Sequence, residues 1–380
     1  MMRVRSIPMA LILIVLSTLI GFPGVSAQQV NYTISNGFVK VYVGDLLVNI
    51  APTSGICNVS LSNHILLMSI GWEIRDSSDN LIAETYKLGI LDVTPPTVTE
   101  VEGGLMVVTS SKVPLGTSPS FEIKTTFVIY STGLILINTT IRAYTNTESG
   151  TTRFVLSLPI DVFSGHDAYF ILSNQEVKTS LPSKYKTYTL YDGPLAIMYS
   201  SSGYGDVIVI SNSPEEIDSV RLDDLRKYGS NYYTLKLEGL SLSGVLASGT
   251  SVNFSLLIYV HNKGPEFTNR IVTVFRYLKD VYASMQSLSK KTPRTPGGRK
   301  VLRECIQEYA VARKAFMKGD FDNAYSHALK AMDLVKSAQS IEVKQRILFY
   351  IVIPDIVLLI LIVFAIKTSR TKAFKESFKS

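Results

Sequence analysis

The chain has 380 residues and two cysteines, and its formal net charge is +7 at pH 7. This charge does not indicate nucleic-acid binding, because no arginine-rich face interleaved with aromatic residues is present. Cys57 and Cys305 are too few for a CxxC-type metal site, and we expect both thiols to be unpaired and buried, with a disulfide between them as the alternative. Phosphate-binding and hydrolase motifs are also missing from the sequence. We therefore predict no nucleic-acid partner, no metal, no cofactor and no catalytic residue.

Residues 1–27 have the layout of a secretory signal peptide. Arg3 and Arg5 make the start positive, and Ala10–Ile20 is an apolar run. Small residues at positions 25–27 then suit a cleavage site. An N-terminal anchor helix is the alternative, but the run is shorter than the roughly 20 residues that a membrane span needs.

Residues 28–262 read as a β-rich ectodomain. Apolar and polar residues alternate along short segments that Gly, Pro and Asn-Gly turn signals separate, as in half-buried strands. Many strands without long helices between them favour a mainly β fold, one large antiparallel β-sandwich. Two smaller sandwiches in tandem, divided near Pro182 or Tyr191, are the alternative. The clearest segments are FVKVYV (38–43), FEIKTTFVIY (121–130), LILINTTIRAY (134–144), DVIVIS (206–211) and VNFSLLIYV (252–260).

The order of these segments resembles that in galactose-mutarotase-like, carbohydrate-active domains. The resemblance rests on NGFVKVYV and APTSGICNVSL, then GWEIRDSSDNLI, then FEIKTTFVIYSTGLILINTTIRA. It implies a large curved sandwich, and an enzyme of that family would use histidines with a carboxylate base. His64, His166 and His261 match no motif of the family, so the resemblance assigns no catalytic residue here.

Four residues are candidates for ligand contact. His166 and Asp167, in FSGHDAYF, could do acid–base work, although neighbouring strand residues point to opposite faces and a polar loop is the alternative. Trp72 could form an aromatic platform for a glycan, with a place in the core as the alternative. Tyr188, in YKTYTLYDG, could contact a ligand or could simply face solvent.

Sequons for N-glycosylation occur at four asparagines within residues 28–262. Because glycans attach only where the asparagine is accessible, each sequon predicts a surface position. The four residues are Asn31, Asn58, Asn138 and Asn253.

Residues 265–345 change to helical periodicity. Apolar residues recur at spacings of three and four in three stretches, which predicts a stalk of three antiparallel helices. The connection between the first two helices carries five cations and no acid, and we expect it to contact anionic lipid headgroups. These cations are Lys290, Lys291, Arg294, Arg299 and Lys300.

Residues 347–366 form an apolar stretch with one charge, Asp355, directly after Pro354. Twenty helical residues cover about 30 Å, the thickness of the hydrocarbon layer, so we predict one transmembrane helix. The tail, residues 367–380, is basic and is expected in the cytoplasm. Asp355 could meet a polar partner on another membrane protein, or it could be tolerated in protonated form.

This layout is similar to that of archaeal membrane-anchored surface proteins. It favours a type I, single-pass cell-surface glycoprotein of the envelope that presents a β-sandwich for glycan or protein binding. Two alternatives stay open. The first is a carbohydrate-active enzyme on the mutarotase-like sandwich. The second is an accessory subunit of a transporter or secretion complex.

Overall fold

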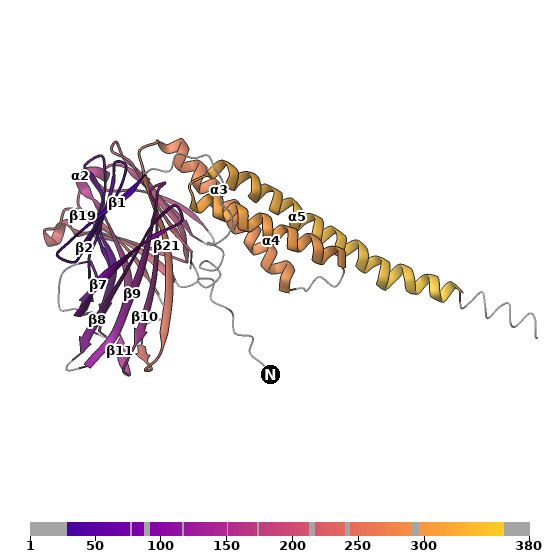
Figure 1. Ribbon diagram of the computed structural model, residues 1–380, viewed down its shortest axis with the longest axis horizontal. Helices are drawn as coiled ribbons and strands as arrows, with labels where there is room; N and C mark the ends of the chain where they lie inside the picture. Colours follow the sequence, from indigo (N-terminus) through magenta and orange to yellow (C-terminus); the bar gives the residue numbers. More distant parts are fainter. Residues whose placement is uncertain are drawn as a thin grey trace, which may run out of the picture. The chain divides into compact units, whose positions relative to one another are not determined.

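The computed structural model divides between Asn269 and Arg270 into two compact units, a β unit followed by a helical unit (Figure 1). Each unit is described by itself below. The signal sequence, the tail and the last six residues of the expected span lie outside the described residues. The structure describes residues 29–76, 78–86, 92–115, 118–149, 151–172, 175–212, 217–239, 244–290 and 296–360.

One sheet of the β unit, here called sheet A, has ten antiparallel strands in the order β1-β2-β3-β4-β5-β12-β19-β18-β15, with β6 also paired to β5. Its first hairpin turns at Asn36-Gly37, where both residues have positive φ (51° and 79°), as a two-residue β-hairpin requires. The strands are Val30–Ser35 (β1), Phe38–Val43 (β2), Leu46–Ile50 (β3), Ile56–Leu61 (β4), His64–Arg75 (β5), Leu81–Glu84 (β6), Thr151–Pro159 (β12), Tyr188–Asp192 (β15), Ser219–Asp224 (β18) and Tyr232–Glu238 (β19).

The facing sheet, sheet B, has nine antiparallel strands in the order β14-β13-β16-β17-β21-β10-β9-β8-β7. A separate pair joins β11 (Thr147–Ser149) to β20 (Gly244–Leu246). The strands of sheet B are Asp92–Val101 (β7), Gly104–Leu115 (β8), Ser118–Tyr130 (β9), Leu134–Ala143 (β10), Asp167–Leu172 (β13), Glu176–Ser180 (β14), Leu195–Ser201 (β16), Asp206–Ser211 (β17) and Ser251–His261 (β21).

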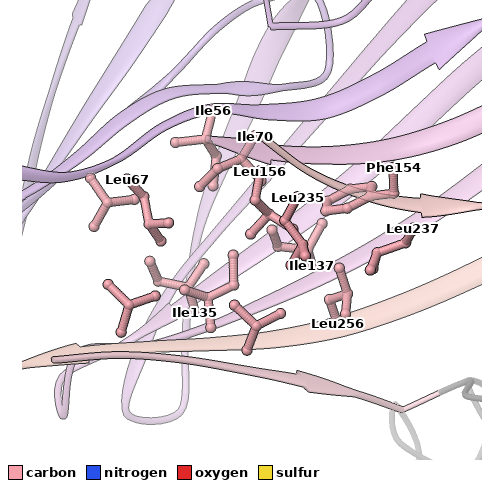
Figure 2. Packing of buried hydrophobic residues seen from close by; sticks show 14 of the residues in the cluster. Ile56, Leu67, Ile70, Ile135, Ile137, Phe154, Leu156, Leu235, Leu237 and Leu256 are labelled. Carbon is pink, nitrogen blue, oxygen red and sulfur yellow. The ribbon is translucent and has the colours of Figure 1, made fainter. Parts of the chain in front are cut away.

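The core between the sheets consists of aliphatic and aromatic side chains from alternate positions of both sheets. In Figure 2, Phe154 and Leu156 of sheet A approach Ile137 and Leu256 of sheet B. Trp72 joins them, with its ring 5.2 Å from that of Phe154 in an edge-on contact. Strands before and after position 182 share both sheets and one core, so the tandem-sandwich alternative is wrong.

The prediction of three helices needs a correction, because the described residues hold four α-helices. The additional one, α2 (Ile160–Phe163), is a single turn inside the β unit. It follows Pro159, the last residue of β12, which has no N–H to donate to a strand ladder. One turn is too short to produce a helical periodicity in the sequence.

The three long helices are α3 (Pro265–Lys290), α4 (Pro296–Met317) and α5 (Phe321–Ile347). Two buried layers of the helical unit each take one residue from every helix. From the first layer to the second, residue numbers rise in α3 and α5 and fall in α4, so neighbouring helices are antiparallel as predicted. The layers are Val281, Cys305 and Ala331, then Leu288, Leu302 and Ala338.

Beyond Ile347 the chain continues as helix to residue 360, with a π-helical turn at Leu348–Val352. This wider turn stands directly before Pro354, whose ring would clash with the carbonyl four residues earlier in a regular α-helix. Within the described part of the chain, which stops at residue 360, no helix is both long and apolar enough to cross a bilayer.

Candidate functional site

The outer face of sheet A carries charged side chains in the middle of buried strands. Along β12, Phe154 and Leu156 point into the core, so alternation directs Arg153 to the outer face. Lys236 on β19 is directed to the outer face in the same way, because its neighbours Leu235 and Leu237 point into the core. Both cations are only 7% exposed. A buried charge is tolerated only when it is paired, so partners must lie beside them.

Arg153 on β12 pairs with one acid on β19 and with another between β5 and β6. Its Nε lies 2.9 Å from Oε1 of Glu238 on β19, and its Nη2 lies 3.3 Å from Oδ1 of Asp79. The β12–β5 register places it opposite Glu73. The contact with Glu238 is an ion pair without hydrogen-bond alignment. Within the described residues, Arg153 Nε and Glu238 Oε1 are buried atoms that lack a hydrogen-bond partner.

Asp223 on β18 is the second centre of the network. Arg221 donates two hydrogen bonds to its carboxylate, from Nε at 2.8 Å to one oxygen and from Nη2 at 3.0 Å to the other. Lys236 Nζ lies 3.0 Å from the same carboxylate. Arg221 also reaches Glu238 at 3.7 Å, which links the two centres.

Glu73 on β5 closes the network at the other side. Tyr86 donates a hydrogen bond of 2.8 Å to its Oε1, and Arg75 Nε lies 3.4 Å from its Oε2. Burial, and then the negative charge of Glu73, raise the pKa of the Tyr86 hydroxyl far above its usual range. Gly71 on β5 leaves room for the segment that carries Tyr86, because a Cβ at position 71 would lie 2.3 Å from Thr85 Oγ1.

We call these residues the ionic face. Its four acids and four bases balance, and its rim is open to solvent at Asp79, where the side chain is 61% exposed. Tyr188 on the edge strand β15 is 59% exposed, and the Arg221 guanidinium lies 5.5 Å from its ring centre. The ionic face comprises Glu73, Arg75, Asp79, Arg153, Arg221, Asp223, Lys236 and Glu238.

Of the four predicted ligand contacts, only Tyr188 lies at the ionic face. Trp72 is 1% exposed in the core, so it cannot form a surface platform, which corrects that hypothesis. Asp167 pairs with Lys178 at 2.8 Å, whereas no described contact joins it to the exposed His166. The acid–base pair suggested by their adjacency is therefore not formed, because Asp167 starts β13 and faces the neighbouring strand.

The ionic face itself was not predicted from the sequence. A signal was present in TTRFVLSLP and YYTLKLE, where single cations interrupt runs of buried-strand residues. Such cations need acidic partners, but the sequence does not say which acids on other strands provide them.

The sequon asparagines differ in accessibility: Asn31 and Asn253 are exposed, and Asn58 and Asn138 are half-buried. Glycosylation at all four stays a prediction. Cys57 and Cys305 are both free thiols, as predicted; Cys305 is buried and Cys57 is half-buried.

The predicted membrane contacts lie in the helical unit. Arg299 and Lys300 are exposed at the start of α4, and Lys290 ends α3. Asp355 is exposed. Their contacts with lipid or a partner stay predictions. Lys291 and Arg294 fall outside the described residues.

Comparison with known proteins finds structural likeness only. No family profile and no curated protein matches the sequence. The similar solved structures include YeaD of Salmonella typhimurium, named as a mutarotase, at 9% identity and a TM-score of 0.39, covering 62% of this chain and 98% of that one. They also include galactose 1-epimerase of Lactobacillus acidophilus NCFM, at 8% identity and a TM-score of 0.37, covering 62% and 99%.

A third is the 4-alpha-glucanotransferase of Thermococcus litoralis, at 7% identity and a TM-score of 0.37, covering 61% of this chain and 39% of that one. The neighbours are thus mutarotase-like and other carbohydrate-active proteins, as the sequence resemblance predicted.

Proposed function

We propose that this protein is a membrane-anchored surface protein that binds a neutral glycan on the ionic face of sheet A. The observation that carries the proposal is a set of paired charges in the middle of buried strands, next to an exposed tyrosine.

The balance of charges favours a neutral, polyhydroxylated ligand. Each sugar hydroxyl can donate to a carboxylate and accept from an arginine, so alternating acids and bases suit it. A phosphate or an acidic polymer would instead require unpaired cations, whereas Arg153, Arg221 and Lys236 already have acidic partners.

The edge next to the ionic face adds apolar surface of the kind that stacks on sugar rings. Tyr188 and Leu190 of β15 and the preceding Tyr185 are 59%, 49% and 45% exposed. Tyrosine combines an apolar ring with a polar tip, which suits a ligand with both kinds of surface.

Anchoring in a membrane is supported by the end of the helical unit. Large apolar side chains cover residues 347–360 on all sides of the helix, and ten of them are at least 38% exposed. A helix that is apolar all round is stable when it is buried in protein or lipid rather than in water. The described part, 14 residues or about 21 Å, would form the first two-thirds of the span.

The topology of the bundle is compatible with headgroup contact by the α3–α4 connection. Leu288, near the end of α3, packs with Leu302 and Ala338. On α5, Ala338 lies nine residues, or about 14 Å, before Ile347, where the expected span begins. The basic α3–α4 connection follows Leu288 and would therefore lie close to the membrane surface.

A direct test is binding of neutral oligosaccharides to the full-length protein in mild detergent, measured by titration calorimetry. We expect Tyr188→Ala to weaken binding about tenfold, equivalent to about 1.4 kcal/mol. Tyr32→Ala is the matched control, because Tyr32 is an exposed tyrosine on β1, the opposite edge strand of sheet A. Binding of acidic polymers alone, or equal affinity of the Tyr188 variant and the wild type, would contradict the proposal.

The role of an accessory subunit in a membrane complex is a second candidate, favoured by Asp355. This acid interrupts an otherwise apolar exposed helix, where a charge is costly unless it has a partner. Co-purification from the native membrane, followed by mass spectrometry, tests this role. A stoichiometric partner that is lost from Asp355→Leu would support it, and unchanged recovery of partners would remove it.

A further inference from the structure

Two of the four sequons face each other on adjacent strands of sheet B. The β10–β21 register pairs Asn138 with Ser255 and Thr140 with Asn253. Ser255 and Thr140 are the hydroxyl residues of the two sequons, NFS and NTT. Each sequon asparagine therefore stands opposite the hydroxyl residue of the other sequon, although more than 100 residues separate them along the chain.

Hydrogen bonds make this pairing reciprocal. Ser255 Oγ donates to Asn138 Oδ1 at 2.7 Å, and Thr140 Oγ1 donates to Asn253 Oδ1 at 2.7 Å. Asn212 Nδ2 in turn donates to Ser255 Oγ at 3.1 Å. In both sequon asparagines the carbonyl oxygen is engaged, while the amide nitrogen has no hydrogen bond to another described residue.

The chemistry of N-glycosylation fits this arrangement. The sugar is joined to Nδ2, and the carbonyl oxygen remains free to accept a hydrogen bond. Because an amide is planar, a bond that holds Oδ1 toward the neighbouring strand directs Nδ2 away from it. The cross-strand hydrogen bonds therefore persist after modification, and they orient the attachment atoms of both asparagines.

The side chains of both sequons lie on the outer face of sheet B. Ile137 and Phe254, their neighbours along the strands, point into the core, so alternation places Asn138 and Asn253 outside. Asn138 and Asn253 are diagonal neighbours across the two strands, about 7–8 Å apart. Asn31 and Asn58 have no such partner; they lie on β1 and β4 of sheet A, and their side chains make no described hydrogen bond.

We propose that Asn138 and Asn253 form one paired glycosylation site, with both asparagines modified on the outer face of sheet B. The pair lies on the opposite side of the sandwich from the ionic face. Glycans there would cover this part of sheet B and leave the ionic face accessible. The inference requires export of the β unit, which is part of the proposed function.

Intact-glycopeptide mass spectrometry on the full-length protein from its native membrane tests this site. We expect peptides with Asn138 and with Asn253 to be occupied in the same molecules. T140A should lose only the glycan on Asn138, and S255A only the glycan on Asn253. The conservative variants T140S and S255T should keep both glycans, because they retain both the sequon and the hydroxyl donor.

Glycan on Asn31 with none on Asn138 and Asn253 would overturn the paired site and leave export intact. A protein without any N-glycan would overturn it as well. Cleavage of the β unit by protease added to intact cells reports export independently, so failure of the site is distinguishable from failure of the proposed function.

Discussion

The outer faces of the two sheets each have a buried part, and the side chains that form these two parts are of opposite kinds. On sheet A, Arg153, Lys236 and Asp223 at 6–7% exposure form a network of paired charges. On sheet B, Ile208 and Leu257 at 0–2% exposure make the corresponding positions apolar. The same alternation of strand residues thus leads to a polar surface on sheet A and, around Ile208 and Leu257, to an apolar packing surface on sheet B.

This difference shows that period-two alternation identifies a strand without saying what covers its second face. The pattern in β2 is half-exposed as expected, with burial at every other residue, whereas all six residues of β17 are buried. Covering an apolar outer face stabilises the folded protein whatever the exact geometry of the contacts. A charged outer face requires every ion to have a partner, so it is specific in geometry and suited to recognition.

The largest effect is expected from breaking the ionic face at Asp223. Asp223→Leu leaves Arg221 and Lys236, both turned to this buried surface, without their shared carboxylate. Removal of one partner from a buried ion network typically costs about 3–5 kcal/mol. We expect that loss in the free energy of unfolding, measured by chemical denaturation.

Asp192→Leu is the control for this change, because Asp192 is an exposed acid on β15, next to β18. A surface substitution of this kind should alter stability by about 0.5 kcal/mol or less. Equal effects of the two variants would mean that the ionic face contributes no more than a solvated surface does.

A second prediction concerns pH and the outer face of sheet B, where His261 pairs in register with Asp206. Burial lowers the pKa of His261 to about 4, against the partly compensating negative charge of Asp206. Thr268 Oγ1 completes the cluster, 2.5 Å from Asp206 Oδ2 and 3.2 Å from His261 Nε2.

Between about pH 6.5 and 4 the unfolded chain therefore binds a proton at this histidine that the folded protein does not. Stability of the β unit should fall as the pH decreases through this window. Unfolding curves recorded from pH 7 to 4 measure the slope, and His261→Gln should reduce it. An unchanged slope in the variant would show that other groups dominate acid sensitivity.

The smallest expected effect concerns the apolar part of the outer face of sheet B, and whether its side chains stabilise the protein as much as core side chains do. Ile208→Val removes one buried methyl group and should cost about 0.5–1.5 kcal/mol. Ile258→Val is the matched change on the core face of β21, and both isoleucines are 0% exposed. Thermal denaturation of both variants should give similar losses; a neutral Ile208 variant would mean that this face is solvated.

Much of the architecture was predictable because its causes are local. The alternation in FVKVYV, the Asn36-Gly37 turn and the three long helices each follow from a few neighbouring residues. The single turn α2 was missed, since four residues cannot show a period of 3.6. Of the candidate site, only Tyr188 was predicted, as an aromatic residue in a polar segment.

The sequence by itself thus determined strands, helices, turns and sequons, because backbone stereochemistry and short motifs act over a few residues. Only the tertiary structure decided which face of each strand is covered. It also brought Glu73, Arg153 and Glu238 together, and it set Asn138 against Ser255. These choices depend on the order and register of strands that lie up to 165 positions apart in the sequence, from Glu73 to Glu238. No local preference carries that information.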